Sequence, residues 1–160
     1  MKKSKMLGVT LLEISLVLAI AALIIVLSIR YYQQSNDAES ANAALTQITS
    51  IASAADSVSN VAGSYVTGLG ATAAAAGTTL NSLLSWPGGS ASATIGNSPW
   101  GSAITVAAVP TQNTYQISFA ATPTSICNLL KVRITTNAHF TTAATCAANA
   151  AFTYTYTSNP

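Results

Sequence analysis

The first thirty-four residues, MKKSKMLGVTLLEISLVLAIAALIIVLSIRYYQQ (1–34), decide how this chain is organised. The apolar run from Val9 to Ile29 contains neither glycine nor proline, and its polar residues are Thr10, Glu13, Ser15 and Ser28. A helix needs about 20 apolar residues to cross a bilayer, whereas the apolar core of a cleaved secretory signal has only about 7–15. We therefore predict that residues 9–32 form a transmembrane helix.

The basic residues around this run predict its orientation. Lys2, Lys3 and Lys5 precede it, and only Arg30 follows it closely. Positively charged flanks stay in the cytoplasm. We expect the N-terminus there and everything after Tyr32 outside.

Glu13 distinguishes this run from an ordinary single-pass anchor. A carboxylate inside an apolar span costs up to about 3 kcal/mol at the centre and less near an end, so it usually marks a function. An ordinary anchor also gives no reason for Gly8, a small residue at the junction of the basic and apolar parts.

The segment Gly8-Val9-Thr10-Leu11-Leu12-Glu13, behind a basic leader and ahead of an apolar helix, resembles the prepilin peptidase site of type IV pilins. The resemblance implies a leader over residues 1–8, cleavage between Gly8 and Val9, and N-methylation of Val9. It also implies that Glu13 pairs with the Val9 amine of a neighbouring subunit and so sets the register of assembly. Valine at position 9 and the absence of a helix proline lean toward the type IVb subgroup, although the short leader is less typical of it.

The resemblance implies a structural subunit, a major pilin, with no catalytic residue, cofactor or metal. Its expected partners are other copies in a helical homopolymer, the prepilin peptidase, an inner-membrane assembly platform with its ATPases, and a host surface or DNA. Such a subunit lies in the inner membrane before assembly and in an extracellular pilus afterwards, serving attachment, aggregation, motility or DNA transfer. Two alternatives stay open: a minor pilin or pseudopilin of a related filament, and a membrane-anchored binding protein that never polymerises.

Residues 33–62 continue the helix with an amphipathic pattern. No glycine or proline occurs from Val9 to Ala62, and we expect Gly63 to end the helix. Apolar residues at spacings of three and four predict one buried face. Its members are Ala41, Leu45, Ile48, Ala52, Ala55, Val58 and Ala62.

Residues 63–160 predict a globular head. We expect the alanines 73–76 to lie in a connection, Thr78 and Thr79 to cap a short helix, residues 97–101 to form a turn, and residues 123–130 to form a second helix. Strands are predicted at 104–109, 115–120, 131–136 and 152–157, the last from its alternation of aromatic residues with threonine. The fold class is α+β, with the long N-terminal helix packed on a C-terminal antiparallel sheet.

Two cysteines, Cys127 and Cys146, lie beyond the membrane-crossing segment. They are either two buried thiols or a disulfide, and an export signal with an even cysteine count favours the disulfide. A loop of about 20 residues closed in this way contributes roughly 3 kcal/mol. The pair also matches the disulfide-bounded region of pilins.

Charged residues make up only 6% of the chain, and its net charge is +2. A nucleic-acid surface requires several clustered cations, which this sequence does not supply. Beyond Asp56 the charged residues are Lys131 and Arg133, two apart on a predicted strand; they are either solvated or contact DNA or an acidic partner. His139 with a cysteine would make a thiol catalyst only with a free thiolate and an orienting partner.

Overall fold

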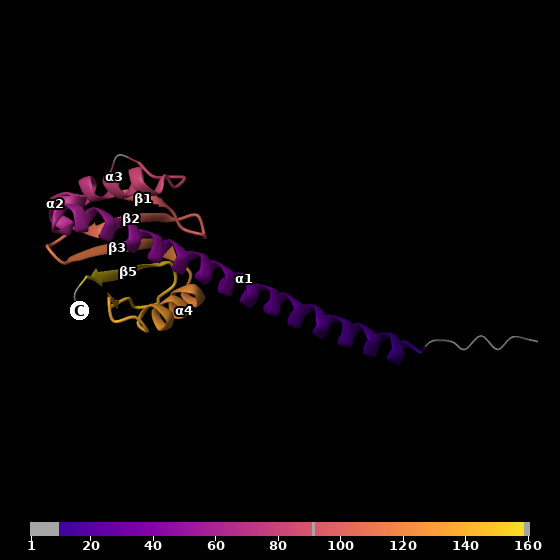
Figure 1. Ribbon diagram of the computed structural model, residues 1–160. Coiled ribbons are helices and arrows are strands. Elements are labelled where there is room, and N and C mark those ends of the chain that lie inside the picture. Colours follow the sequence, from indigo (N-terminus) through magenta and orange to yellow (C-terminus); the bar gives the residue numbers. More distant parts are fainter. Residues whose placement is uncertain (1–9, 91, 159–160) are drawn as a thin grey trace, which may run out of the picture. The chain divides into compact units, whose positions relative to one another are not determined.

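The computed structural model describes residues 10–90 and 92–158. The chain divides into two compact units, Met1–Asn36 and Asp37–Pro160. The helix α1 (Leu11–Ala62) runs through the boundary between them (Figure 1). In the second unit α1 packs on a five-stranded antiparallel sheet. The predicted α+β arrangement is therefore confirmed.

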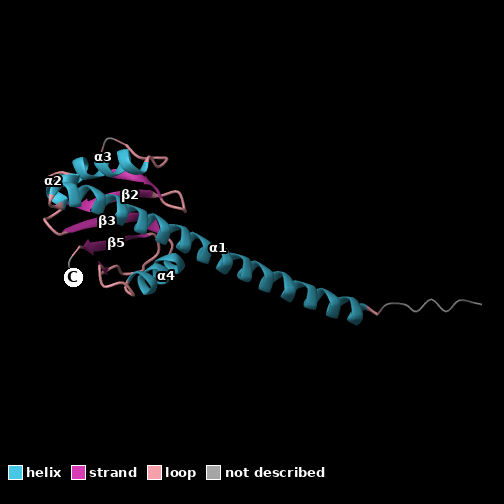
Figure 2. Ribbon diagram, in the orientation of Figure 1, coloured by secondary structure: helices cyan, strands magenta, loops and turns pink. Residues whose placement is uncertain are grey.

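The strands of the sheet are β1 (Thr94–Asn97), β2 (Ala103–Ala108), β3 (Thr114–Thr122), β4 (Phe140–Thr141) and β5 (Ala150–Thr157). Their spatial order is β1-β2-β3-β5-β4, and each neighbouring pair is antiparallel. Figure 2 shows β2, β3 and β5 side by side in this order. The strand β5 thus lies between β3 and β4. The register of β3 with β5 sets Tyr115 opposite Tyr156 and Phe119 opposite Phe152.

Side chains of a strand point alternately to the two faces of the sheet, and on β3 and β5 the apolar residues occupy the positions of one face. The buried members on β3 and β5 are Tyr115, Ile117, Phe119, Phe152, Tyr154 and Tyr156. The same core includes a stripe of α1, namely Ala41, Ala44, Ile48, Ile51, Ala52 and Ala55. The small alanine side chains let the helix lie close to the aromatic face of the sheet.

The buried face of α1 is broader than predicted at its centre and weaker at its end. Ala44 and Ile51 are buried although they were not predicted, whereas Leu45, Val58 and Ala62 are only half-buried. Four of the seven predicted members are fully buried, since the α1 core list contains Ala41, Ile48, Ala52 and Ala55.

The predicted helix end at Gly63 and the predicted turn at residues 97–101 are confirmed. Gly63, with φ of +84°, ends α1, because an L side chain is disfavoured in this left-handed conformation. The turn at 97–101 ends with Gly101, whose amide donates to the Ser98 carbonyl at 2.9 Å. The short helix α2 (Tyr65–Leu69) was not predicted.

The helix α3 (Ala73–Leu84) begins earlier than predicted. The alanines 73–76 form its first turn and not a connection, which agrees with the high helix propensity of alanine. The N-cap is Thr72 and not Thr78 or Thr79: its Oγ1 accepts a hydrogen bond from the Ala75 amide at 3.1 Å.

The predicted strand at 131–136 is wrong. The predicted helix at 123–130 continues instead, as α4 (Thr124–Ile134). Its buried residues are Ile126, Cys127, Leu130 and Ile134, which share one helical face. Burial of Ile134 on that face outweighs the local strand preference of the β-branched residues Val132, Ile134 and Thr135.

The other three predicted strands are confirmed as β2, β3 and β5, with ends that differ by a few residues. The edge strands β1 and β4 were not predicted. They have 4 and 2 residues, too few for an alternating pattern to stand out in the sequence.

Candidate functional site

The first part of α1 presents an apolar surface. From Leu11 to Ile29 every large apolar side chain is exposed, with exposed fractions between 49% and 89%. The helix is long and apolar enough to cross a membrane, judged by length and composition. Apolar surface on this scale is normally covered by lipid or by other protein.

Glu13 lies in the first turn of α1, within this apolar surface. Its side chain is exposed, and its backbone amide donates to the Thr10 carbonyl at 2.9 Å. A carboxylate in the first helical turn is favoured by the helix dipole by about 0.3–1 kcal/mol. That gain is small compared with the cost of burying an unpaired charge, so any partner that covers this surface must also satisfy Glu13.

The predicted cleavage site, Gly8 and Val9, lies outside the described residues. The predicted pairing of Glu13 with a Val9 amine therefore remains a prediction. The structure does show that the helix is already formed at Leu11, two residues after Val9. Glu13 thus has a fixed position on the helix surface.

Cys127 and Cys146 form a disulfide, with their Cα atoms 5.6 Å apart. Cys127 is buried on α4, and Cys146 lies in the segment between β4 and β5. The bond therefore fastens α4 to the chain that leads into β5. Both thiols are consumed, so neither is a nucleophile. His139 instead places Nδ1 2.8 Å from the Thr157 carbonyl oxygen and stacks on Tyr156.

A carboxylate that sequence reasoning did not single out holds the second unit together. Asp56, on α1, accepts hydrogen bonds from two tyrosine hydroxyls, Tyr65 of α2 on Oδ1 and Tyr156 of β5 on Oδ2. The rings of Tyr65 and Tyr156 lie edge to face, with centroids 6.3 Å apart, and Tyr115 stacks on Tyr156 at 5.1 Å. One side chain thus connects three elements that are distant in sequence.

These contacts keep the tyrosines protonated. Burial raises the pKa of Tyr156 to about 12, and its hydrogen bond to Asp56 adds to the effect. The same two causes, burial first, raise the pKa of Tyr65 strongly. Burial also raises the pKa values of Tyr115 and Tyr154, whose hydroxyls have no hydrogen-bond partner among the described residues.

A signal for Asp56 does exist in the sequence. It is the last acidic residue of the chain, and it directly follows Ala55 of the predicted buried face. An acid at the margin of a buried stripe requires hydrogen-bond donors, and a tyrosine hydroxyl is a donor that suits a core.

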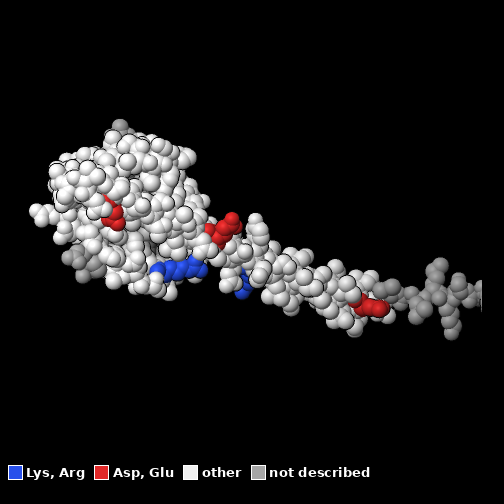
Figure 3. Space-filling view, in the orientation of Figure 1, with Lys and Arg blue, Asp and Glu red and all other residues white. Residues whose placement is uncertain are grey.

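The two cations of the head lie on α4 and not on a strand. Lys131 Nζ donates to the Ala144 carbonyl at 3.2 Å, and Arg133 Nη1 donates to the side-chain oxygen of Asn42 on α1. Both acceptors are neutral. Most of the surface visible in Figure 3 is uncharged.

No protein-family model, curated protein or solved structure matches this chain.

Proposed function

We propose that this chain is a structural subunit, a major pilin, of a type IV pilus, and that it polymerises through the first part of α1. The proposal rests above all on Glu13, a carboxylate on a helix surface that is otherwise apolar and exposed. The sequence resemblance around Gly8 and Val9 supports the same reading. The type IVb subgroup fits best, because valine stands at position 9 and no proline interrupts the helix.

Polymerisation gives Glu13 a role that membrane anchoring does not. Near one end of a membrane helix a carboxylate reaches headgroups or water at modest cost. In a dry bundle of such helices that escape closes, and an unpaired buried charge costs several kcal/mol. Pairing with the amine of a neighbour's Val9 removes this cost at one axial offset only. The pair then fixes the register in which copies assemble.

The proposed path has three stages. The precursor is held in the inner membrane by residues 9–32, with the leader 1–8 in the cytoplasm. The prepilin peptidase cleaves after Gly8, and the new amine at Val9 is methylated. An assembly platform driven by ATPases then moves the subunit out of the bilayer into a pilus on the cell surface. There the filament serves attachment, aggregation, motility or DNA transfer, with a host surface or DNA as the outside partner.

The low charge of the second unit is consistent with close packing of many copies. Its charged residues are Asp37, Glu39, Asp56, Lys131 and Arg133. Like units with a large net charge would repel one another at short distance. This surface does not oppose dense assembly.

The two alternatives make different demands. A minor pilin or pseudopilin would share Glu13 but be present at few copies per filament. A membrane-anchored binding protein that never polymerises would function without Glu13. A high abundance of the chain in sheared filaments would distinguish a major pilin from a minor one. A loss of function on substitution of Glu13 would distinguish a pilin from a binding protein that never polymerises.

The test replaces Glu13 in the full chain, in cells that make it. Glu13→Val should still be cleaved at Gly8 and still form the disulfide, yet enter filaments poorly. Glu13→Lys should be worse, since it sets two positive groups together. Ser15→Val, two residues along the same helix, is the matched control and should assemble normally. The measurement is the yield of sheared filaments relative to total cleaved protein, and normal filaments from Glu13→Lys would refute the proposal.

A further inference from the structure

The charges of the second unit are few and are separated by sign. Asp37 and Glu39 lie two residues apart on α1, and Lys131 and Arg133 lie on α4 on either side of the exposed Val132. The first pair is called the acidic surface and the second pair the basic surface. Three of these side chains are exposed, and Asp37 is half-buried. Asp56, the remaining acid, is already bonded to two tyrosines.

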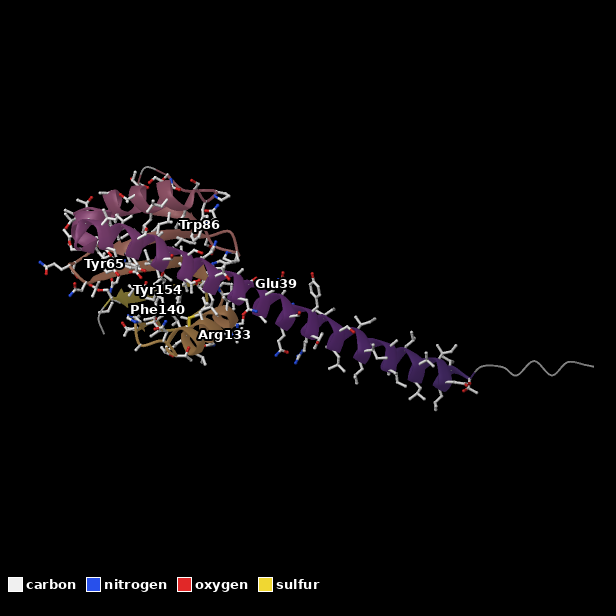
Figure 4. All side chains as sticks on the ribbon, viewed as in Figure 1. Glu39, Tyr65, Trp86, Arg133, Phe140 and Tyr154 are labelled. Atoms are coloured by element: carbon white, nitrogen blue, oxygen red, sulfur yellow. A yellow bond between two sulfur atoms is a disulfide. The ribbon has the colours of Figure 1, made fainter. Side chains whose placement is uncertain are left out.

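The two surfaces lie at nearly the same position along the axis of α1 but on different sides of that helix. Arg133 reaches Asn42, which is three residues, or about one helical turn, beyond Glu39. Figure 4 shows Glu39 and Arg133 on opposite sides of α1, and Figure 3 shows acidic and basic atoms separated in the same way.

Within the described part of the chain, these charged groups do not bond to one another. In the part of the chain that the structure describes, side-chain hydrogen bonds to a carboxylate end on Asp56 alone. The basic side chains bond instead to the neutral oxygens of Asn42 and Ala144. Between Lys131 and Arg133, Val132 is also exposed, at 70%. An exposed apolar residue between two cations fits a contact surface for a second molecule.

We propose that the basic surface of one copy, Lys131 and Arg133, docks on the acidic surface of a neighbouring copy, Asp37 and Glu39. Opposite charges on different sides of one molecule form a heterologous contact: each copy offers one surface to the copy before it and the other to the copy after it. Contacts of this type repeat along a ring or a helical filament and do not close as a simple pair. The inference rests on the proposed assembly of this chain into filaments.

Charge complementarity of this kind determines which partner docks, and in what register, more than how tightly it binds. The surfaces are exposed, so salt screens them: the Debye length is about 10 Å at 0.1 M ionic strength. The proposed contact is therefore distinct from the pairing of Glu13, which lies within apolar surface. Glu13 sets the offset of the helices, and the charged surfaces set which sides of neighbouring heads meet.

Two reversed variants of the full chain test the contact. Glu39→Lys puts a cation on the acidic surface, and Arg133→Glu puts an acid on the basic surface. Each alone should lower the yield of sheared filaments about tenfold or more, because like charges then face each other. When the two variants are made in the same cell, filaments should return and should contain both in similar amounts, since each supplies what the other lacks.

Rescue by mixing separates this contact from pairing inside one chain. A single chain with both Glu39→Lys and Arg133→Glu should assemble whether the charges pair between copies or within one chain. If the double variant assembles and the mixture does not, the charges pair within a chain and the proposal is overturned. The proposal is also overturned if either single variant assembles at the normal yield.

Two controls guard against misfolding and against general charge effects. Asn42→Ala removes the partner of Arg133 within the chain and should leave assembly unchanged. Ala148→Lys adds a cation at another exposed position and should also leave assembly unchanged. Closure of the disulfide in each variant reports that the head has folded. If the unaltered chain forms no filaments, the proposed function fails; if it does and the reversed variants match it, only the charged contact fails.

Discussion

The hydroxyl of Tyr156 donates a hydrogen bond of 2.9 Å to Oδ2 of Asp56, which lies 100 residues earlier in the chain. Tyr65 donates to the other oxygen of the same carboxylate. The end of α1, the short helix α2 and the strand β5 are therefore joined through one side chain. Because the tyrosine rings are largely buried, water competes poorly for these bonds.

Removing this carboxylate should destabilise the head. Asp56→Asn weakens two hydrogen bonds to a charged group, and Tyr156→Phe removes one, which should cost about 1.5–3 kcal/mol. Tyr154→Phe is the matched control: its buried hydroxyl has no partner in the described part of the chain, so its loss should be neutral or stabilising. Urea unfolding of the full chain in detergent, followed by the fluorescence of Trp86 and Trp100, measures the differences. Equal losses in Tyr156→Phe and Tyr154→Phe would contradict this account.

Stability should fall at high pH through the tyrosines. The pKa of Tyr156 is about 12 in the folded chain, against an ordinary value of 10.0. The unfolded chain therefore loses this proton first, and the stability is fully present below pH 10 and is lost as the pH rises to about 12. The loss from this residue is on the order of 3 kcal/mol. Urea midpoints measured from pH 9 to 12 should fall less steeply in Tyr156→Phe, and parallel curves would disprove the assignment.

The disulfide gives a separate prediction. Alkylation without reduction should label neither Cys127 nor Cys146 in exported protein. Replacing both with serine should cost about 3 kcal/mol by the loop-entropy model, for a sequence separation of 19. Mass spectrometry checks the labelling, and urea unfolding checks the stability. Cleavage at the N-terminus should be unaffected, because the bond lies entirely within the head.

Gly77 should not tolerate alanine, although it lies within a helix. A Cβ at this position would lie 2.6 Å from the backbone of Ala93. The backbone must therefore move, which should cost about 1–3 kcal/mol despite the better helix propensity of alanine. Thr78→Ala, the next residue along α3 and exposed, should change stability by less than about 0.5 kcal/mol. Thermal unfolding of the two variants compares them, and a stabilised Gly77→Ala would show that α3 moves away freely.

Processing at the N-terminus tests the resemblance itself. A larger side chain at the residue before the cut crowds the backbone in a protease cleft. Gly8→Val should therefore leave an uncut precursor in the membrane, whereas the unaltered chain should begin at a methylated Val9. Mass spectrometry of filament protein reads both. Retention of residues 2–8 in filaments, or a cut beyond Ile29, would exclude a prepilin.

The sequence alone predicts what depends on local pattern. The long helix follows from an unbroken apolar run and then a buried stripe ended by Gly63. The strands β2, β3 and β5 follow from alternation and β-branched residues. The position of Glu13 on the apolar surface follows directly from these patterns.

What the sequence did not predict depends on contacts between distant residues. The residues 131–136 have a local strand preference, and burial of Ile134 beside Leu130 makes the segment helical as far as residue 134. The role of Asp56 requires knowing that β5 returns to the end of α1. Lys131 and Arg133 were noticed in the sequence as a possible contact, but their neighbours, the Ala144 carbonyl and Asn42, follow from α4 and not from the predicted strand.

The place of β5 in the sheet has a consequence for how the head is made. A ribosome delivers the chain from its N-terminus, so β5 emerges after every other strand, yet it must insert between β3 and β4. Until residues 150–157 arrive, β3 has a bare hydrogen-bonding edge and β4 has no neighbour, while both cysteines have already emerged. The nascent head is therefore an open acceptor for any extended strand, and its completion competes with capture by chaperones or by other nascent copies.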